Sequence, residues 1–173
     1  EGREMHGDAL PDVYGGFGTS LRFYGVDFSI GFTYQLGGQV LDQGYRFYMN
    51  SPAGTSTGNN YHHDLLNSWT PENSGSNIPR FAYNDSNQAA VSDRFLTSAS
   101  YLNIQNITLG YTLPKRITRK FLVENLRIYL ACDNVWYWSK RQGLDPRQSI
   151  NGITNPYYYA PIRTFSGGVT VTF

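Results

Sequence analysis

The sequence predicts an all-β fold, an antiparallel up-and-down sheet of the kind that forms transmembrane β-barrels. Three observations predict it. Apolar and polar residues alternate along five segments of the chain, which gives each strand one apolar and one polar face. In four of these segments the mid-strand charges fall on the polar face. The two shorter connections lie on one side of the predicted sheet and both long connections lie on the other, as in outer-membrane barrels.

The composition of the chain narrows its class. Its 173 residues carry a formal net charge of +1, which excludes a basic footprint for nucleic acid and predicts no polybasic membrane patch. Charged residues make up 16% of the chain, against about 25% in ordinary soluble domains, and aromatic residues also reach 16%. The single cysteine, Cys132, excludes an intrachain disulfide framework and a cysteine-cluster metal site. The longest apolar run, Ile128–Cys132, is too short for a transmembrane helix.

The first two predicted strands form a hairpin. Val26–Leu36 alternates most clearly, and one of its faces carries Val26, Phe28, Ile30, Phe32, Tyr34 and Leu36. Phe17–Tyr24 precedes it, with Phe17, Leu21 and Phe23 on its apolar face. Only Gly25 separates the two segments, so we expect a very short turn between them.

The middle of the chain is a long polar stretch followed by a third strand. Asp42–Arg94 is rich in Asn, Ser, Gly and Thr and holds one short helical candidate near His63–Trp69. The strand Tyr101–Leu113 changes its apolar phase part-way, which one extra residue near Gln105–Asn106 would explain as a β-bulge. We expect one amphipathic helical turn within Lys115–Glu124.

The last two predicted strands are Leu126–Trp138 and Arg163–Phe173. Arg163 shares the apolar parity of its strand, and we expect it at the outer membrane interface, where a charge costs about 0–1 kcal/mol rather than the ~2–4 kcal/mol of mid-bilayer. The mid-strand charges that fall on the polar face of the other strands are Arg22, Asp27, Arg127 and Asp133.

Strand length also favours a membrane barrel. At about 3.3 Å per residue and a tilt of about 40°, Val26–Leu36 covers roughly 28 Å along the membrane normal, which matches an apolar band of about 25 Å. Amphipathic aromatic rings favour the headgroup layer, and such rings gather near the strand ends. They are Tyr24, Tyr34, Tyr101, Tyr111, Trp136, Trp138 and Phe173.

Five stretches of the chain resemble a known family. They are GGFGTSLRFYGVDFSIGFTYQLGG (Gly15–Gly38), SWTPENSGSNIPR (Ser68–Arg80), RFLTSASYLNIQNITLGYTLP (Arg94–Pro114), LRIYLACDNVWYWSKRQGLDP (Leu126–Pro146) and APIRTFSGGVTVTF (Ala160–Phe173). In this order, and with WTPEN, NITLGYTLP and a terminal aromatic strand combined, they resemble the C-terminal end of a SusC/RagA-type TonB-dependent outer-membrane transporter.

The resemblance implies a larger assembly. It implies a 22-stranded barrel in the outer membrane of a Gram-negative cell, of which residues 1–173 form the last five strands, without the plug domain. It also implies nutrient import of an oligosaccharide or peptide, capture by a SusD-like surface lipoprotein, contact with outer-membrane lipid, and energy from the TonB complex through the missing plug. No leader stands at Glu1, so we expect a removed signal or a piece of a longer protein.

Candidate chemical groups are few, and we predict no catalytic residue, no cofactor and no metal. His62, His63 and Asp64 are adjacent, and adjacent side chains on an extended segment point to opposite faces, which predicts a solvated loop and not a metal site. Cys132 lies on an apolar face and is expected to be inert. The loop carboxylates are predicted to be turn formers; they are Asp42, Asp85, Asp93 and Asp145.

Two groups of residues are predicted to bind partners. Exposed aromatic residues of the outer loops are candidates for ligand or lid contacts, since aromatic rings stack on sugars and partner proteins; these are Trp69, Tyr157, Tyr158 and Tyr159. The last strand resembles the aromatic-ended strand that barrel-assembly machinery recognises, through Phe165, Val169, Val171 and Phe173.

Two alternatives to an importer remain at this point. A soluble, secreted β-sandwich, for example a carbohydrate-binding module, would explain the alternation and the aromatic residues. A sandwich needs two facing sheets that share one dry core, whereas a barrel piece is one curved sheet with an exposed apolar side. An outer-membrane barrel enzyme is the third class, and it lacks any grouping of nucleophile and base.

Overall fold

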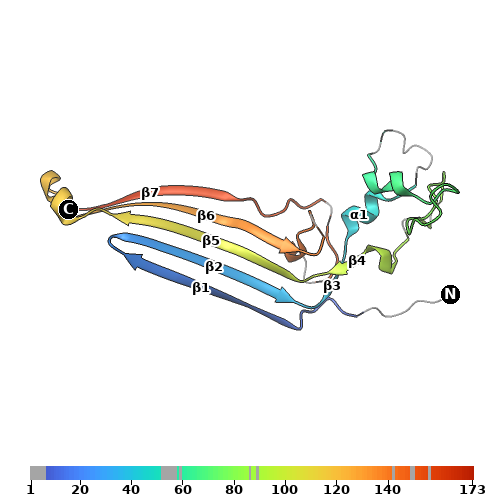
Figure 1. Ribbon diagram of the computed structural model, residues 1–173, viewed down its shortest axis with the longest axis horizontal. Helices are drawn as coiled ribbons and strands as arrows, with labels where there is room; N and C mark the ends of the chain where they lie inside the picture. The colour runs from blue at the N-terminus through green and yellow to red at the C-terminus, as the bar shows by residue number, and fades with distance from the viewer. Residues whose placement is uncertain are drawn as a thin grey trace.

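The chain forms one long antiparallel sheet with a small body of loops at one end (Figure 1). The computed structural model describes residues 7–51, 58, 60–85, 87–88, 90–141, 143–148, 151–155 and 157–173. Its five long strands follow one another in chain order, as β1-β2-β5-β6-β7, so the predicted up-and-down sheet is confirmed. They are β1 (Val13–Phe23), β2 (Val26–Leu36), β5 (Tyr101–Thr112), β6 (Asn125–Ser139) and β7 (Thr164–Thr172).

The predicted hairpin turn between β1 and β2 is a two-residue loop. Phe23 pairs with Val26, which leaves Tyr24 and Gly25 as the loop, both with positive φ (46° and 86°). Two positive φ values are those of a type I′ turn, whose twist matches the twist of the flanking strands. Thr112 donates its N–H to the Gly25 carbonyl at 2.7 Å, so β5 ends at the same side of the sheet as this turn.

The phase change in β5 is a bulge, as predicted. Across β2 and β5 the register shifts between Gly31 and Phe32, because Asn106 and Ile104 are their successive partners. A second irregularity in β6 was not predicted. There Asn134 takes a left-handed φ of 50°, and its Nδ2 donates to the carbonyl of Ile162 at 3.2 Å. The irregularity at Asn134 is therefore hydrogen-bonded to the loop that leads into β7.

Short elements make up the rest of the described chain. The helical candidate after His62 is the 3-10 helix η1 (His63–Asn67), and the turn after β5 is α2 (Lys115–Thr118) with η3 (Arg119–Phe121). No helix in the described ranges is long and apolar enough to cross a membrane. Elements that the sequence did not predict are β3 (Gln39–Leu41), α1 (Gln43–Tyr48), η2 (Asp93–Phe95), β4 (Leu96–Ser98) and η4 (Pro146–Gln148).

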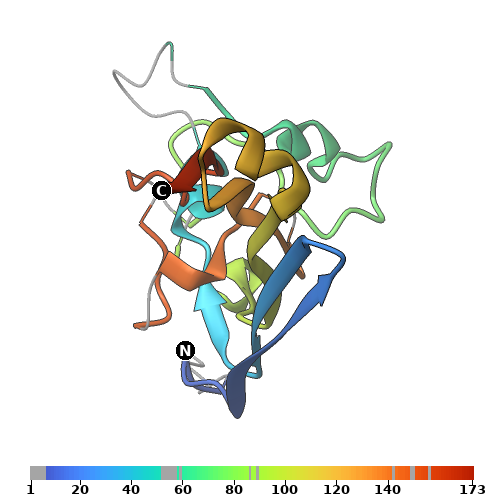
Figure 2. The ribbon, with the colours of Figure 1, turned by 90° about the vertical axis from the view of Figure 1, so that its left-hand side faces the viewer.

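The buried core lies in the loop body and not on the long sheet. The buried apolar side chains of the described residues are Val40, Leu41, Met49, Phe95 and Ala99, none of which belongs to a long strand. Figure 2 shows the sheet from the end that carries α2 and η3, as a single curved layer. A β-sandwich would need a second sheet over the same core, so the sandwich alternative does not fit this architecture.

Candidate functional site

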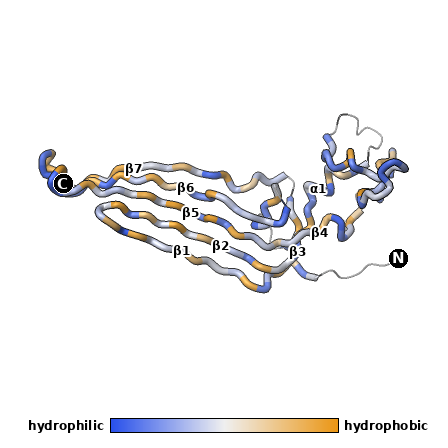
Figure 3. Tube along the Cα trace, viewed as in Figure 1, coloured by the Kyte–Doolittle hydropathy of each residue, from blue (hydrophilic) through white to orange (hydrophobic). Residues whose placement is uncertain are grey.

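One face of the long sheet is apolar and uncovered. The registers of the four strand pairs place apolar side chains opposite one another across all five strands, and Figure 3 shows the alternation along each strand. Leu21 is 62% exposed, Leu130 is 65% exposed and Phe165 is 76% exposed. A contiguous apolar surface of this size needs an apolar environment. Other members of this apolar face are Phe17, Phe23, Val26, Phe28, Ile30, Ile107, Leu109, Ile128, Val169 and Val171.

The opposite face is polar and carries a cross-strand ion pair. The Arg127 guanidinium of β6 donates from Nε to Asp27 Oδ1 at 2.9 Å and from Nη2 to Asp27 Oδ2 at 2.5 Å. Arg22 of β1 lies directly opposite Asp27, so three charges share one patch of this face. Asp27 and Arg127, whose charges would be costly against lipid, are thus paired on the side away from the apolar face.

Gly110 makes room for this ion pair. It pairs with Asp27 on one side and with Tyr129 on the other, so β5 runs between the two charged strands. A Cβ on Gly110 would lie 2.5 Å from both Asp27 carboxylate oxygens and 2.6 Å from Arg127 Nη2. The ion pair therefore passes over β5 where a side chain is missing, and it ties β2 to β6.

Aromatic side chains mark both ends of the apolar face. Phe23, Tyr24 and Phe173 are 72%, 87% and 89% exposed at the end with the hairpin turn. At the other end Trp136 is 54% exposed, and the Arg163 guanidinium lies 5.6 Å from the centre of its ring. Arg163 thus lies just before β7, on the apolar parity, against an aromatic ring.

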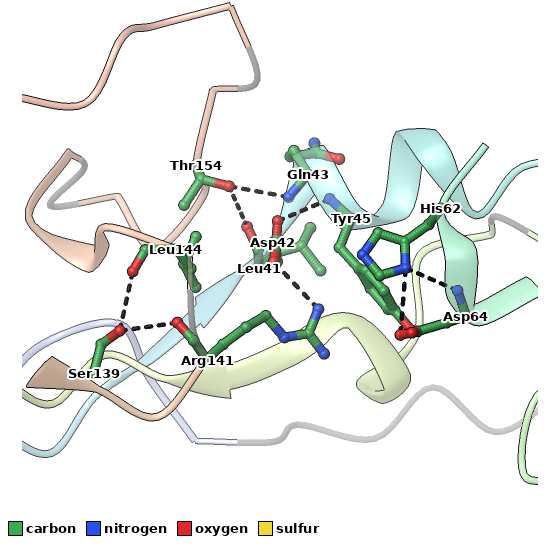
Figure 4. Close-up of polar contacts among 10 residues, drawn as sticks. All are labelled: Leu41, Asp42, Gln43, Tyr45, His62, Asp64, Ser139, Arg141, Leu144 and Thr154. Carbon is green, nitrogen blue, oxygen red and sulfur yellow. Dashed lines mark hydrogen bonds and ion pairs between the residues drawn. The ribbon is translucent and has the colours of Figure 1, made fainter. Parts of the chain in front are cut away.

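The loop body holds a polar cluster around Asp42, which is 6% exposed (Figure 4). Asp42 Oδ1 accepts the N–H of Tyr45 at 2.9 Å and so caps α1, while Oδ2 accepts from Arg141 at 3.2 Å. The Arg141 guanidinium lies 4.0 Å from the centre of the Tyr45 ring. Thr154 Oγ1 accepts from the N–H of Gln43 at 3.0 Å. These contacts join the first and last outer loops.

His62, His63 and Asp64 do gather, so the prediction that their side chains point apart was wrong. The chain is not extended here, since η1 begins at His63 and turns the backbone. The possible ligand atoms of the three residues lie within 4.8 Å of one another. His62 Nδ1 already accepts the N–H of Asp64 at 3.2 Å, and Tyr45 donates its hydroxyl to Asp64 at 2.9 Å. In this arrangement the cluster caps η1 and ties it to α1.

Three of the predicted turn-forming carboxylates, Asp42, Asp85 and Asp145, accept a backbone N–H from two or three residues further along the chain, as turn formers do. Asp85 Oδ1 accepts the N–H of Asn87 at 2.9 Å, and Asp93 begins η2. Asp145 is 2% exposed and binds Arg147 through two hydrogen bonds, of 2.8 and 2.6 Å. Hydrogen bonding to this carboxylate raises the pKa of Arg147 above its ordinary value.

The predicted recognition residues lie in the loop body. Tyr157, Tyr158 and Tyr159 are 78%, 67% and 97% exposed, while Trp69 is 37% exposed and donates its backbone N–H to the Ile78 carbonyl at 2.8 Å. Within the described ranges, no ring contact joins Trp69 to the three tyrosines. Tyr157 lines an open depression of about 560 Å³ together with Phe47, Ile153 and Gln43, among others.

The opposite end of the sheet carries a basic segment that sequence reasoning missed. Four exposed cations stand within six residues: Lys115, Arg116, Arg119 and Lys120. The net charge of +1 did not reveal this local cluster, because it sums over the whole chain. A window count of charges along the sequence would have found this segment.

Comparison with known proteins adds to this geometry. No protein-family model matches the chain. TonB-dependent receptor P3 of Formosa agariphila is 26% identical over 99% of the chain, and TonB-dependent receptor SusC of Bacteroides thetaiotaomicron is 28% identical over 94%. The solved RagAB peptide transporter matches with a TM-score of 0.82 at 24% identity, over 98% of the chain.

The chain resembles a segment of a SusC/RagA-type TonB-dependent receptor. The resemblance drawn from the sequence motifs is confirmed, and the likeness to RagAB confirms the barrel-segment fold. The segment spans a small part of these relatives: 17% of receptor P3, 15% of SusC and 18% of the matched RagAB chain.

Proposed function

We propose that the chain is part of the barrel wall of an outer-membrane, TonB-dependent nutrient importer. The observation that carries this proposal is the single-layer sheet with one exposed apolar face and one polar face. In a barrel of this kind the apolar face contacts lipid and the polar face lines the lumen. Residues 1–173 then supply the C-terminal strands of the barrel domain, and the plug and the remaining strands come from the rest of the receptor.

A test of the wall uses neighbouring residues of β2 in the complete receptor. Single cysteines at Ile30 and at Ser29, in a Cys132→Ser background, are spin-labelled after reconstitution into lipid. The label at position 30 should collide with dissolved oxygen more than with a water-soluble nickel chelate, and the label at position 29 should show the reverse. Equal exposure of both labels to the nickel chelate would rule out a lipid-facing wall.

We propose that the transported nutrient is an oligosaccharide or a peptide, captured with a SusD-like lipoprotein, with energy from the TonB complex. The relatives support this class: a SusC receptor is similar over 94% of the chain, and the matched RagAB structure is described as a peptide importer. Deletion of the complete receptor gene should abolish uptake of one such nutrient, and restoration of the gene should restore it. Unchanged uptake of all glycans and peptides tested would contradict the proposal.

The outer loops are proposed to contact the nutrient or the lipoprotein through Tyr157, Tyr158 and Tyr159, with Trp69 as a separate contact. Their exposure supports this role, and a depression of about 560 Å³ beside Tyr157 is in the range of small-ligand sites. A triple Tyr→Ala variant should reduce co-purification of the lipoprotein or binding of the nutrient at least tenfold. Leu66→Ala, an 89% exposed apolar side chain of the same loop body, is the matched control and should change neither.

We also propose that β7 is the strand recognised during barrel assembly. Phe165, Val169 and Val171 alternate on its apolar face, and Phe173 extends the pattern with 89% exposure. Phe173→Ala should lower the amount of assembled receptor in the outer membrane, while Thr172→Ala on the other face should not. Equal assembly of both variants would argue against this role.

A further inference from the structure

We infer that the segment from Lys115 to Leu122 is a membrane anchor that binds the headgroups of anionic phospholipids. It connects β5 to β6 beyond the strand ends, at the end of the sheet with the short β1–β2 turn (Figure 2). This inference rests on the proposed barrel wall, because only an embedded wall places the segment beside a bilayer. The sorted connections then place it at the periplasmic leaflet.

The position of the segment relative to the membrane follows from the aromatic residues next to it. Tyr111, 42% exposed, is the last apolar-face residue of β5, and Lys115 comes four residues later. Tyr24 and Phe173 are at the same end of the sheet. Rings of this kind mark the headgroup layer of a barrel, so the segment begins where the headgroups are.

The charge of the segment is positive and unpaired. Lys115, Arg116, Arg119 and Lys120 are exposed, and none of the four makes an ion pair with any described residue. The nearest acidic residue along the chain is Glu124. Each cation near an anionic membrane surface strengthens binding by about fivefold, so four in six residues form an effective electrostatic contact.

Apolar side chains accompany these cations. Ile117 and Phe121, four residues apart, are 45% and 72% exposed, and Leu122 is 89% exposed. Thr118 is 2% exposed, which fixes the inner side of the turn and leaves these three side chains outward. Leu122 also adopts a left-handed φ of 58°, a conformation that glycine or asparagine adopts at lower cost. Cations beside exposed Phe and Leu are the composition of interfacial membrane anchors.

The test places a tryptophan probe in the segment of the complete receptor, as Phe121→Trp, in vesicles of phosphatidylcholine and phosphatidylglycerol. Two preparations have the same overall composition and differ only in which of the two lipids carries brominated chains, which quench nearby tryptophan. The added fluorescence, after subtraction of the parent receptor, should be quenched several-fold more strongly when the bromine is on phosphatidylglycerol. High salt should remove this preference.

Two charge variants separate the segment from the overall charge of the protein. In F121W, R119Q/K120Q should remove most of this difference in quenching, because each cation strengthens binding to the anionic surface by about fivefold. R80Q/K140Q removes two exposed cations from the other end of the molecule and should leave the preference unchanged. If the charge variants do not assemble, the loss of the phosphatidylglycerol preference of F121W at high salt tests the electrostatic contact by itself.

The outcomes distinguish this inference from the proposed function. If the wall is not embedded, brominated lipid will quench neither the new tryptophan nor Trp136 and Trp138 of the apolar face. If Trp136 and Trp138 are quenched but the new tryptophan is not, the proposed barrel wall is supported and the membrane anchor is refuted. A segment that contacts a periplasmic protein instead of lipid would give this result. Equal quenching by both brominated lipids would likewise refute recognition of the anionic headgroup.

Discussion

The absence of a side chain at Gly110 allows an ion pair to form between two strands that are not neighbours. The Asp27–Arg127 ion pair crosses β5 in the space that a Cβ at this position would occupy. The strands β2 and β6 are not hydrogen-bonded neighbours, so this contact adds a link that the backbone ladder does not provide. The ion pair also neutralises the charges of Asp27 and Arg127 on the lumen side of the proposed wall.

Gly110→Val should break that link. The new side chain displaces the Arg127 guanidinium, and overpacking of this kind costs about 1–3 kcal/mol. The complete receptor should therefore unfold at a lower temperature, measured by the heat-dependent shift in electrophoretic mobility that folded barrels show. Thr108→Val, which puts the same side chain on the same strand and face, should have little effect. Equal loss of stability in both variants would mean that the ion pair contributes nothing.

Tyr45 makes the stability of the loop body depend on pH. Burial and the hydrogen bond to Asp64 raise the pKa of the Tyr45 phenol above its ordinary value of 10.0. Because the folded state favours the neutral phenol, its contribution to stability is complete below pH 10.0 and is lost as the pH rises through the raised pKa. Burial also raises the pKa of Tyr137, so an ultraviolet titration should show late phenolate transitions, one of which Tyr45→Phe removes. If Tyr45→Phe leaves every late transition in place, Tyr45 is not the source of one.

At the scale of the strand, the alternation itself predicts opposite outcomes for neighbouring residues. Leu130→Arg puts a charge on the apolar face in the middle of β6, at a cost of about 2–4 kcal/mol in a bilayer. Ala131→Arg puts the same side chain on the polar face and should cost much less. The free energy of unfolding of the complete receptor in lipid vesicles, measured in urea, gives both values. Similar losses at the two positions would contradict the assignment of the faces.

The long strands could be predicted because the alternation of apolar and polar residues is visible in the sequence itself. Val26–Leu36 carries five full alternations, and its predicted bounds are those of β2. The β5 bulge was also predictable, since an extra residue changes the apolar phase. The three-residue strands β3 and β4 show too little alternation, and they pair residues far apart in the chain, such as Leu41 with Leu96.

The loop sites were harder to predict for similar reasons. The gathering of His62 to Asp64 depends on a 3-10 turn, and its packing against Tyr45 comes from another segment (ring centres of Tyr45 and His62 lie 4.7 Å apart). The ion pair of Asp42 with Arg141 joins residues 99 positions apart. Sequence reasoning placed each of these residues in polar loops, but partners at such separations are set by the fold.

At the scale of the whole chain, the sheet has two open edges and an uncovered apolar face. Among the described residues, the outer strands β1 and β7 each pair on one side only. Unpaired edges and exposed apolar surface both promote aggregation. The 173-residue chain, expressed alone without detergent, should therefore sediment as large aggregates, and detergent should reduce their size. A monodisperse species that unfolds cooperatively without detergent would contradict the barrel assignment.

The location of the core has a consequence for which parts of the chain tolerate substitution. Met49, Phe95 and Leu41 pack together outside the long strands, so the loop body has an apolar core of its own. Substitutions in the loop body can therefore change its packing without disturbing the hydrogen-bond ladder of the long strands.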